Sequence, residues 1–329
     1  MNTHRTAVIG CGDIARTGHV PAILEHPAFE LVALCDVDEP RAASLAAEYS
    51  VATVCTDYRE LLPANDIEAV VIATHPEHSV GIAIDALKAG KAVLDEKPIA
   101  TTIEDANRLR EVVNRTGAVY QIGFVLRTCP WAQGIARLAQ SLGTPCITEV
   151  ALYDERLDRE NRAHYAKIQG ILTHSSAITH EGSHIIDYAK LWIPADPVAL
   201  RAHALRTDPD LAGPNLWKAQ ISMRDGSLLC MAIGWMLEDL PPSQVRVVGP
   251  RGWMVVGIYD GVGTCRVGGK QTDVKLPGMS PDWQAQLDFF DQSIREGRGL
   301  GPSVEDGSYT LGITAACERS AATQAPVEL

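Results

Sequence analysis

Apolar and polar positions alternate in two different ways along this 329-residue chain. In the first third, short and nearly continuous apolar runs are separated by amphipathic stretches that end at glycine. Such runs are typical of parallel strands covered on both faces, and the stretches between them are typical of crossover helices. The pattern thus predicts an α/β Rossmann domain with a parallel sheet over residues 1–123. The expected strands are 6–9, 29–35, 69–73, 92–94 and 118–122, with helices at 77–89 and 103–116.

From about residue 145 onward, polar and apolar residues alternate over longer segments, which is typical of an antiparallel sheet. Turn residues such as Asp225-Gly226 favour hairpins between these segments. Two helical stretches follow at 283–296 and 305–323, and we expect the first to pack on the second domain. The pattern predicts an α+β C-terminal domain over residues 124–329 with a mostly antiparallel sheet. Its expected strands are 147–154, 198–205, 218–223, 228–235, 244–248 and 253–259.

The balance of charge argues against several classes of partner. Forty-one acidic residues outnumber 29 basic ones, so the formal net charge is −12. No basic stripe is present to displace the counterions of a nucleic acid. No apolar run approaches the roughly 18 residues that a membrane-spanning helix needs. The eight cysteines are scattered without disulfide or zinc spacing, which favours reduced thiols. We expect a cytoplasmic protein that acts on a small-molecule substrate and binds neither nucleic acid nor membrane.

Residues 10–15 read GCGDIA and follow the first expected strand, which matches the dinucleotide-binding pattern G-x-G-x-x-A. The glycines permit a tight turn and let the backbone approach a pyrophosphate, whose charge is met by N–H groups at the start of the next helix. The residues of this loop that we expect to contact the cofactor are Gly10, Gly12, Asp13 and Ile14.

Asp36 ends the second expected strand, where a Rossmann domain carries the acidic residue that binds the adenosine ribose. Its carboxylate would accept hydrogen bonds from the ribose hydroxyls and repel the 2′-phosphate of NADP. The next residues, Val37, Asp38 and Glu39, add no positive charge before Arg41. The sequence therefore predicts NAD as the cofactor, in preference to NADP.

Two further segments resemble motifs of one enzyme family. Residues 95–98 read DEKP, which resembles the E-K-P motif of the glucose-fructose oxidoreductase, inositol dehydrogenase and rhizopine catabolism (Gfo/Idh/MocA) family. Residues 182–187 read GSHIID, which resembles the G-x-H-x-x-D segment of the same family. The residues before E-K-P, those at the crossing into the second domain and the C-terminal pattern also resemble the family. The resemblance thus spans nearly the whole chain.

The resemblance implies a large open antiparallel sheet in the second domain and an NAD-dependent oxidoreductase. The reaction it implies interconverts a secondary alcohol and a ketone on a sugar, a cyclitol or a related small polar molecule. Lys97 would be the catalytic lysine beside the nicotinamide, and His184 the general acid/base. A base of near-neutral pKa takes the hydroxyl proton, and an ammonium group stabilises the developing alkoxide. Family members often pair through the open sheet face, so a homodimer or homotetramer is expected.

The other residues that we expect to contact the cofactor or the substrate lie on segments that border the predicted cleft. On the cofactor side we expect Thr74, His75, Glu96 and Lys97. On the substrate side we expect Lys97, Arg127, Tyr153, Tyr165, His180 and His184.

The chain departs from the family at His180, because family members usually carry Asp four residues before the motif histidine. His180 and His184 are one helical turn apart, so both imidazoles would point to the same side. A carboxylate stabilises an imidazolium, whereas a second imidazole does not. We therefore expect the pair to titrate as a coupled unit with a lowered first pKa, and we count His180 among the catalytic residues as a modulator.

Other functions could use the same residues. Residues 180–184 read HEGSH, which matches the zinc motif H-E-x-x-H, with Glu181 to activate water and His174 as a third ligand. A glycine inside the required helix and the unexplained Rossmann pattern argue against this zinc metallohydrolase, and we expect no metal. A lyase or glycosidase that oxidises a carbinol transiently would use the same cofactor without net redox change. A cofactor-binding regulator is the third alternative, and the retention of Lys97 and His184 argues against it.

Overall fold

The computed structural model describes residues 3–329, which fold into two compact units. The first unit contains the chain up to Val125 together with Asp282–Leu311. The second unit contains Leu126–Pro281 and Gly312–Leu329. The chain therefore leaves the first unit, builds most of the second, and returns before it ends.

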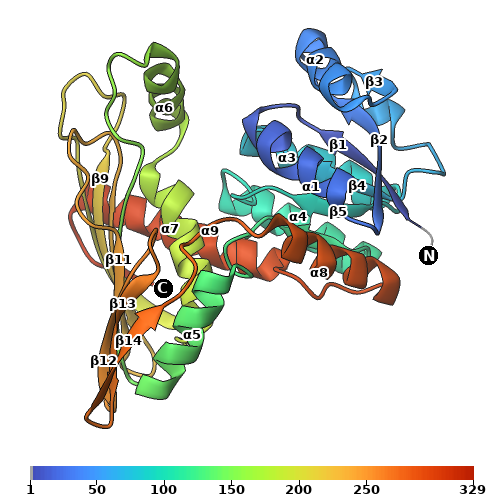
Figure 1. The fold of residues 1–329 in the computed structure, drawn as a ribbon. Helices are drawn as coiled ribbons and strands as arrows, with labels where there is room; N and C mark the ends of the chain where they lie inside the picture. The colour runs from blue at the N-terminus through green and yellow to red at the C-terminus, as the bar shows by residue number, and fades with distance from the viewer. Residues whose placement is uncertain (1–2) are drawn as a thin grey trace. The chain divides into compact units, whose positions relative to one another are not determined.

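The first unit contains a six-stranded parallel sheet with the order β3-β2-β1-β4-β5-β6 (Figure 1). This order reverses direction at β1, which is typical of a doubly wound Rossmann domain. The predicted parallel sheet is confirmed, with one short strand, β3, that the pattern had not indicated. The strands are β1 (His4–Ile9), β2 (Phe29–Cys35), β3 (Thr53–Cys55), β4 (Ala69–Ile72), β5 (Ala92–Asp95) and β6 (Tyr120–Ile122).

The crossover helices begin and end where the sequence provides capping residues. Thr102 accepts the backbone N–H of Asp105 at 3.1 Å at the start of α4, and Gly117 ends this helix with a φ of +64°. Asp38 caps the start of α2 in the same way by accepting the N–H of Arg41 at 3.1 Å. The helices are α1 (Val20–Glu25), α2 (Glu39–Tyr49), α3 (Pro76–Lys88) and α4 (Ile103–Thr116), with a short 3₁₀ turn at Tyr58–Glu60.

A widened π-helical turn, Ala15–His19, connects the glycine loop to α1. In this turn the N–H of Val20 bonds to the carbonyl of Ala15. Pro21 follows directly, has no N–H to donate, and would clash with the carbonyl one regular turn earlier. The wider turn relieves this conflict and rotates the side chains that precede the proline.

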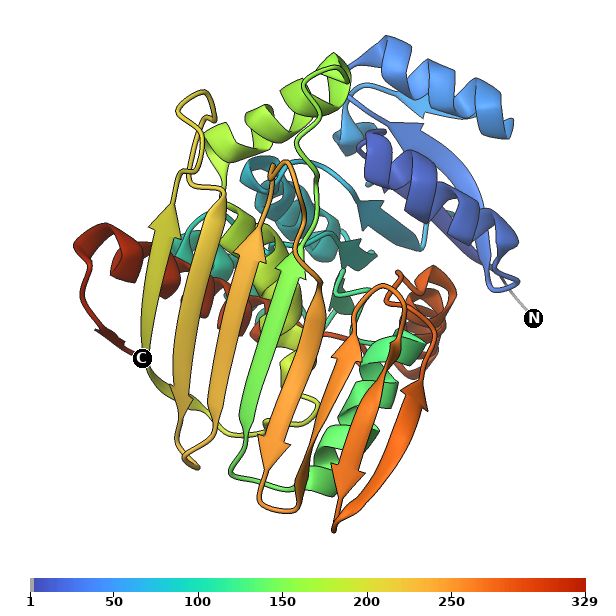
Figure 2. The same cartoon turned by 60° about the vertical axis from the view of Figure 1, so that its left-hand side comes forward.

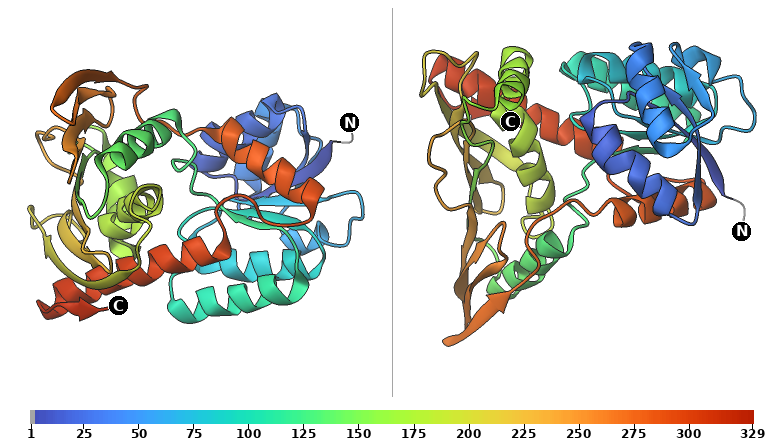
Figure 3. Two further views of the ribbon diagram at one scale, coloured as in Figure 1. Left: turned by 90° about the horizontal axis from the view of Figure 1, so that it is seen from below. Right: turned by 45° about the horizontal axis from the view of Figure 1, so that its top comes forward.

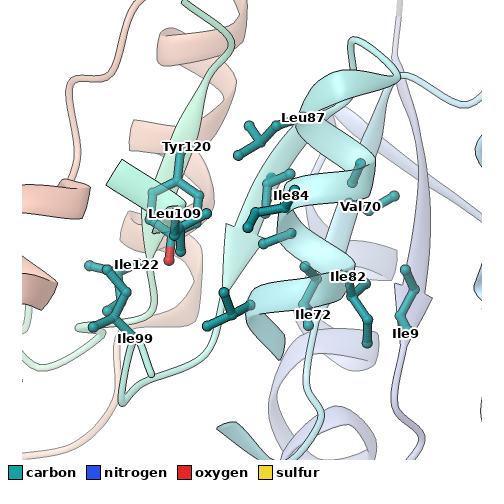
Figure 4. Packing of buried hydrophobic residues seen from close by; sticks show 14 of the residues in the cluster. Ile9, Val70, Ile72, Ile82, Ile84, Leu87, Ile99, Leu109, Tyr120 and Ile122 are labelled. Atoms are coloured by element: carbon teal, nitrogen blue, oxygen red, sulfur yellow. The ribbon is translucent and has the colours of Figure 1, made fainter. Parts of the chain in front are cut away.

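Each face of the parallel sheet is buried in its own apolar cluster. Ile9, Val70 and Ile72 lie beside α3, as Figure 4 shows, and their cluster also contains Leu109 of α4. Val8 and Val71, one position along the same two strands, belong to the opposite cluster, as does Leu34 of β2. Neighbouring strand residues are therefore buried on alternate faces, which explains why the strands read as continuous apolar runs.

Helix α8 (Trp283–Glu296) corrects the predicted domain organisation. We expected this helix to pack on the second domain, but its apolar face covers the parallel sheet of the first unit. Phe290 stacks on Phe29 with ring centroids 5.8 Å apart, and Asp291 lies 2.8 Å from Nε2 of His4. Residues 282–311 thus lie outside the second domain that was predicted as 124–329, because α8 supplies the apolar cover that one face of the sheet needs.

The second unit contains a nine-stranded sheet with the order β14-β13-β12-β11-β7-β10-β9-β8-β15 (Figure 2). The pairing of β7 with β10 is parallel and all the other pairings are antiparallel. The predicted open, mostly antiparallel sheet is confirmed, and β13, β14 and β15 extend it. The strands are β7 (Ile147–Tyr153), β8 (Pro197–Leu205), β9 (Leu216–Met223), β10 (Leu228–Gly234), β11 (Gln244–Gly249), β12 (Gly252–Gly257), β13 (Val262–Val267), β14 (Lys270–Lys275) and β15 (Val327–Glu328).

Helices cover one face of this sheet, with α7 on β10 and β9 and α5 on β11 and β12 (Figure 3). On β7, Val150 and Leu152 point to the covered face and are buried. The alternate residue Ile147 is 47% exposed on the other face. The helices of the second unit are α5 (Pro130–Leu142), α6 (Arg162–His174) and α7 (Ala177–Ala189). Helix α9 (Val304–Thr323) begins in the first unit and belongs to the second from Gly312 onward.

Two expectations about the chain as a whole concern its cysteines and helices. All eight cysteines are free thiols, as predicted. Within residues 3–329, no helix combines the length and the apolar character that crossing a membrane requires.

Candidate active site

The glycine loop follows β1 at the carboxyl edge of the parallel sheet. The N–H of Gly10 donates to the carbonyl of Cys35 at 2.8 Å, which ties the loop to β2. Gly10 has a φ of +94°, and a Cβ on this residue would lie 2.5 Å from the carbonyl oxygen of Ala73. Both the backbone angle and the neighbouring strand therefore require glycine at this position.

Gly12 differs from Gly10, because a Cβ on Gly12 would meet no protein atom within 4 Å. The packing of the chain itself thus leaves open space above this residue, at the start of the helical segment that begins at Asp13. A helix start with open backbone above it suits the approach of a pyrophosphate group. Ile14, in the same first turn, is 39% exposed.

Asp36 fixes the glycine loop through its carboxylate. One oxygen accepts the N–H of Cys11 at 2.8 Å, and the other accepts the N–H of Asp38 at 2.9 Å. The guanidinium of Arg41 lies 3.6 Å from the first of these oxygens. Asp36 therefore organises the loop, a role that adds to the ribose contact expected from the sequence. Burial, reinforced by the Asp36 charge, raises the pKa of the Cys11 thiol to about 12, so this thiol is not a nucleophile.

Thr74 and His75 follow β4, and Glu96 and Lys97 follow β5. Since β1, β4 and β5 are neighbours in a parallel sheet, their carboxyl ends meet at one edge, where a Rossmann domain binds its dinucleotide. His75 is the residue before α3, and its extended backbone leads into Pro76. The structure therefore brings the expected cofactor residues of the first unit to one edge of the sheet.

Glu96 and Lys97 are joined by a hydrogen bond, because the Lys97 N–H donates to Oε2 of Glu96 at 3.1 Å. The other carboxylate oxygen accepts a hydrogen bond from Nε2 of His19 at 2.8 Å. The side chain of His19 is 2% exposed and that of Glu96 is 11% exposed. Sequence reasoning missed His19, because it lies 77 positions from Glu96 and belongs to no motif.

Asp95 lies directly before Glu96 and points into the core of the first unit. Burial raises the pKa of its carboxyl well above the usual range, and the Glu96 charge adds to this effect, while a hydrogen bond from Tyr120 opposes it. The Tyr120 hydroxyl lies 3.1 Å from Oδ2 of Asp95. The buried surroundings of Asp95 thus favour the protonated form of its carboxyl group.

In the second unit, His180 and His184 lie one turn apart on α7. Ser176 caps the start of this helix by accepting the N–H of Thr179 at 3.3 Å, and its hydroxyl donates to Glu318 of α9 at 2.6 Å. The imidazole of His180 lies 5.6 Å from the ring of Trp235, measured between centroids, and His184 is 8% exposed. Helix α7 thus presents both histidines from one well-anchored element.

Asp187, the last residue of the G-x-H-x-x-D segment, forms an ion pair with Arg127. The Nε of Arg127 lies 3.0 Å from Oδ2 of Asp187, and its Nη2 contacts Oδ1. The Asp187 side chain is 1% exposed and that of Arg127 is 20% exposed. The pair ties the beginning of the second unit to α7, so Arg127 has a structural partner. Its predicted contact with the substrate stays a prediction.

A group of carboxylates surrounds the end of β7, next to the predicted substrate residue Tyr153. Burial raises the pKa of Asp154 to about 8, and the charges of Glu181 and Glu155 add to this effect. The hydroxyl of Tyr259 lies 3.4 Å from Oδ2 of Asp154. The sequence did not reveal this group, because its members come from the end of β7, from α7 and from the segment after β12.

Tyr165, another predicted substrate residue, lies on α6. Its hydroxyl accepts a hydrogen bond from the side-chain amide of Gln169 at 2.7 Å. The guanidinium of Arg159 lies 5.8 Å from the centre of its ring. These contacts are confined to α6 and the segment before it, and they leave the predicted role of Tyr165 as a prediction.

The H-E-x-x-H match does lie on one helix, as a zinc site requires. Over residues 3–329, however, no three His, Cys, Asp or Glu side chains group so that they could hold a metal ion. Within that range His174, the last residue of α6, forms no such group with the two histidines of α7. In the described part of the chain, the zinc motif thus lacks the third ligand that catalytic zinc sites use.

The parallel sheet, the glycine loop and the acidic residue after β2 define an NAD-binding Rossmann oxidoreductase. Residues 4–124 match the family described as "Oxidoreductase family, NAD-binding Rossmann fold". An uncharacterized oxidoreductase, ORF334 of Rhizobium meliloti, is 30% identical, and the match covers 98% of each chain. The chain belongs to the Gfo/Idh/MocA oxidoreductase family.

Other relatives extend the comparison to whole-chain similarity and to the fold. An inositol 2-dehydrogenase/D-chiro-inositol 3-dehydrogenase of Shouchella clausii is 27% identical over 97% of this chain and 92% of the relative. An oxidoreductase from Agrobacterium radiobacter, solved with NAD⁺, L-tartaric acid and magnesium, has a TM-score of 0.87 at 17% identity. That match covers 99% of this chain and 98% of the relative, and it shows that the two folds are alike.

NAD is the cofactor of this oxidoreductase family, and the first unit fits it. No protein atom occupies the space above Gly12, so the pyrophosphate of the cofactor has room there. Asp36 is 7% exposed and follows β2. A carboxylate at this position favours the free 2′-hydroxyl of the NAD ribose over the 2′-phosphate of NADP. The chain is therefore an NAD(H)-dependent oxidoreductase.

Proposed function

We propose that this enzyme interconverts a secondary alcohol and a ketone on a sugar, a cyclitol or a related small polar molecule. The observation that supports this class most strongly is the presence of both family motifs, with Lys97 after β5 and His184 on α7. Full-length relatives named inositol dehydrogenases and a partial match to a D-apiose dehydrogenase of Paraburkholderia graminis agree with this class. In this proposal the first unit binds NAD and the second unit binds the substrate.

The two motif residues divide the polar chemistry between them. His184 accepts the hydroxyl proton of the alcohol during oxidation and returns it during reduction, because an imidazole changes protonation near neutral pH. The ammonium group of Lys97 stabilises the oxygen as negative charge develops on it. When bound, NAD⁺ would accept the hydride from the carbinol carbon. Of the other predicted residues, Gly10, Gly12, Asp13, Ile14, Asp36, Thr74, His75 and Glu96 bind the cofactor, and Arg127, Tyr153 and Tyr165 contact the substrate.

His180 modulates His184 in this proposal. Helix α7 carries an imidazole at the position where the family usually has a carboxylate, so position 180 supplies no negative charge to His184. We expect His180→Asp to shift the acid limb of the pH profile of kcat/KM, because a carboxylate favours the protonated imidazole. An unchanged profile would show that His180 does not influence the general base.

The decisive experiment is a screen of inositols, aldoses, glycosides and hydroxy acids at 340 nm with NAD⁺, and of the matching ketones with NADH. A dehydrogenase accumulates NADH with its alcohol substrate. A redox-neutral lyase or glycosidase converts its substrate without net NADH, so product analysis on compounds that give no absorbance change identifies that alternative.

Matched variants test the assigned residues on the best substrate from the screen. Lys97→Met should lower kcat by about a thousandfold or more while the Kd for NAD changes by less than about threefold. Lys88→Met, on the exposed end of α3, is the control and should keep full activity. An equal loss of turnover and NAD affinity in Lys97→Met would mean that this lysine binds the cofactor and does not catalyse.

We also propose that two or more copies assemble through the open face of the nine-stranded sheet. Ile147 and Val248 are paired across β7 and β11 on this face and are 47% and 45% exposed. Exposed apolar pairs of this kind favour burial in an interface. Ile147→Asp with Val248→Asp should lower the mass measured by light scattering, whereas Leu24→Asp on α1 should not.

A further inference from the structure

Buried histidines of the first unit bond to carboxylates, and one of these carboxylates differs from the others in its position. The pairs are His4 with Asp291 at 2.8 Å, His26 with Asp288 at 3.1 Å, and His19 with Glu96 at 2.8 Å. The first two carboxylates belong to α8 and fasten that helix to the sheet. Glu96 instead lies directly before Lys97, so the third pair connects the helix after the glycine loop to the proposed catalytic lysine.

The Glu96 carboxylate bridges His19 and the backbone of Lys97. Its Oε1 accepts the imidazole hydrogen bond at 2.8 Å, and its Oε2 accepts the Lys97 N–H at 3.1 Å. Gly123 leaves room for this carboxylate, because a Cβ there would lie 3.0 Å from Oε1. Both oxygens are therefore engaged, and the carboxylate has a defined orientation.

His19 is itself held on the opposite side by Trp283 of α8. The two rings meet edge to face, with centroids 4.9 Å apart and an interplanar angle of 66°. Gly18 makes this approach possible, since a Cβ there would lie 2.5 Å from the Trp283 ring. The widened turn before Pro21 and the return of the chain at α8 thus combine to fix one imidazole.

We propose that His19 is a positioning residue for Lys97, acting through the Glu96 carboxylate. The imidazole holds Glu96, and Glu96 holds the backbone from which the lysine side chain extends. This inference rests on the proposed catalytic role of Lys97. It also means that the glycine loop and the lysine belong to one hydrogen-bonded assembly, because His19 lies in the first turns after that loop.

Two variants of nearly equal size separate the hydrogen bond from the volume of the imidazole. A glutamine in place of His19 carries an amide N–H near the position of Nε2, whereas a methionine there has no donor. We expect His19→Met to lower kcat by about tenfold to a hundredfold, with a smaller change in KM, because a small displacement of a catalytic group costs this much. His19→Gln should recover most of the loss.

A second measurement needs neither cofactor nor substrate. The Lys97 amide is protected by its bond to Glu96, so its hydrogen exchange reports the orientation of that carboxylate. We expect His19→Met to speed this exchange by about tenfold or more relative to His19→Gln. His26→Met removes another buried histidine that is bonded to a carboxylate, and it is the matched control. It should lower stability but leave both kcat and Lys97 exchange unchanged.

Each outcome of these experiments supports or overturns the positioning role of His19. If His19→Met and His26→Met lower kcat equally, or if His19→Gln behaves like His19→Met, the positioning role is wrong even though Lys97→Met is inactive. If Lys97→Met remains active, the catalytic assignment of the lysine fails and the inference fails with it. Should His19→Met not fold, Trp283→Leu keeps the imidazole but loosens it. That variant should also lower kcat and speed the exchange of the Lys97 amide, each by a smaller factor. The absence of both effects would overturn the proposal.

Discussion

The carboxylates described in the two units are held in opposite ways. In the first unit, Asp36 and Glu96 each accept a backbone N–H and lie beside a basic side chain, Arg41 or His19. In the second unit, Asp154 lies among other carboxylates, and burial together with their charges raises its pKa. The first arrangement fixes geometry, whereas the second holds a proton.

This difference agrees with what the proposed function asks of each unit. A cofactor of constant shape is bound best by a rigid edge whose acidic groups are fully satisfied before binding. An acid/base site must exchange protons near neutral pH, and a carboxyl group can do so only when burial or like charges raise its pKa. Four predictions test how far this contrast holds.

We expect the largest effect on stability at Asp187, a carboxylate of the second unit that is held in the same way as those of the first. Asp187 is buried and paired with Arg127, like the carboxylates of the first unit. Asp187→Ala leaves the guanidinium without that partner and should lower the free energy of unfolding by about 3–5 kcal/mol. Denaturant unfolding measures this value. Asp187→Asn keeps the hydrogen-bonding oxygen and should cost less, and equal losses would show that the charge of the pair contributes nothing.

The two loop glycines sharpen the idea of a pre-formed edge. Gly10→Ala forces a side chain into a positive φ and against Ala73, so it should lower stability by about 2 kcal/mol or more. Gly12→Ala meets no protein atom and should leave stability within about 0.5 kcal/mol. The same variant should weaken NAD binding by about tenfold or more, measured by calorimetry. Unchanged affinity in Gly12→Ala would argue against a pyrophosphate at this position.

Asp154 tests the proton-holding side of the contrast. Its pKa in the folded protein, about 8, lies above the unfolded value, so the folded state keeps a proton that the unfolded chain loses as pH rises above about 4. The group therefore costs stability progressively between these values and by a constant amount above them. Asp154→Asn should raise stability by on the order of 1–2 kcal/mol at pH 8, after discounting for partial exposure, and by nothing near pH 4.

The control for Asp154→Asn is Glu149→Gln on the exposed face of β7. Thermal unfolding across this pH range should show a larger pH-dependent difference for Asp154→Asn than for Glu149→Gln. A constant gain at every pH would mean that the Asp154 proton is not responsible.

The smallest effect concerns the choice of cofactor. Asp36→Ser removes the carboxylate next to Arg41, which then has one fewer acidic neighbour and can meet a 2′-phosphate. We expect the preference for NAD over NADP to fall by about tenfold to thirtyfold, measured as the ratio of Kd values. Arg41→Ala in the same background should remove the gained NADP affinity. If the preference persists in Asp36→Ser, the discrimination lies elsewhere in the first unit.

Much of the first unit could be predicted because its signals are local. Continuous apolar runs indicated buried parallel strands, and Thr102 and Gly117 marked the two ends of one helix. The loop glycines indicated a dinucleotide and Asp36 indicated NAD. The E-K-P segment, together with the G-x-H-x-x-D segment of the second unit, indicated the family. Each of these features depends on residues within a few positions of one another, where chain geometry constrains what can form.

Only the tertiary structure decided where distant segments meet. Helix α8 reads as an amphipathic helix wherever it packs, so its sequence did not show that it returns to the first unit. His19 reads as an ordinary helical residue until Trp283 and Glu96 are placed against it, and Asp154 reads as the polar end of a strand until Glu181 and Tyr259 surround it. The sequence by itself determined the two sheet types, several of the helices and the cofactor, because these follow from local spacing, and it indicated the family through motifs that resemble it. The environment of each charge was decided by the fold, because burial and electrostatic neighbours depend on three-dimensional packing.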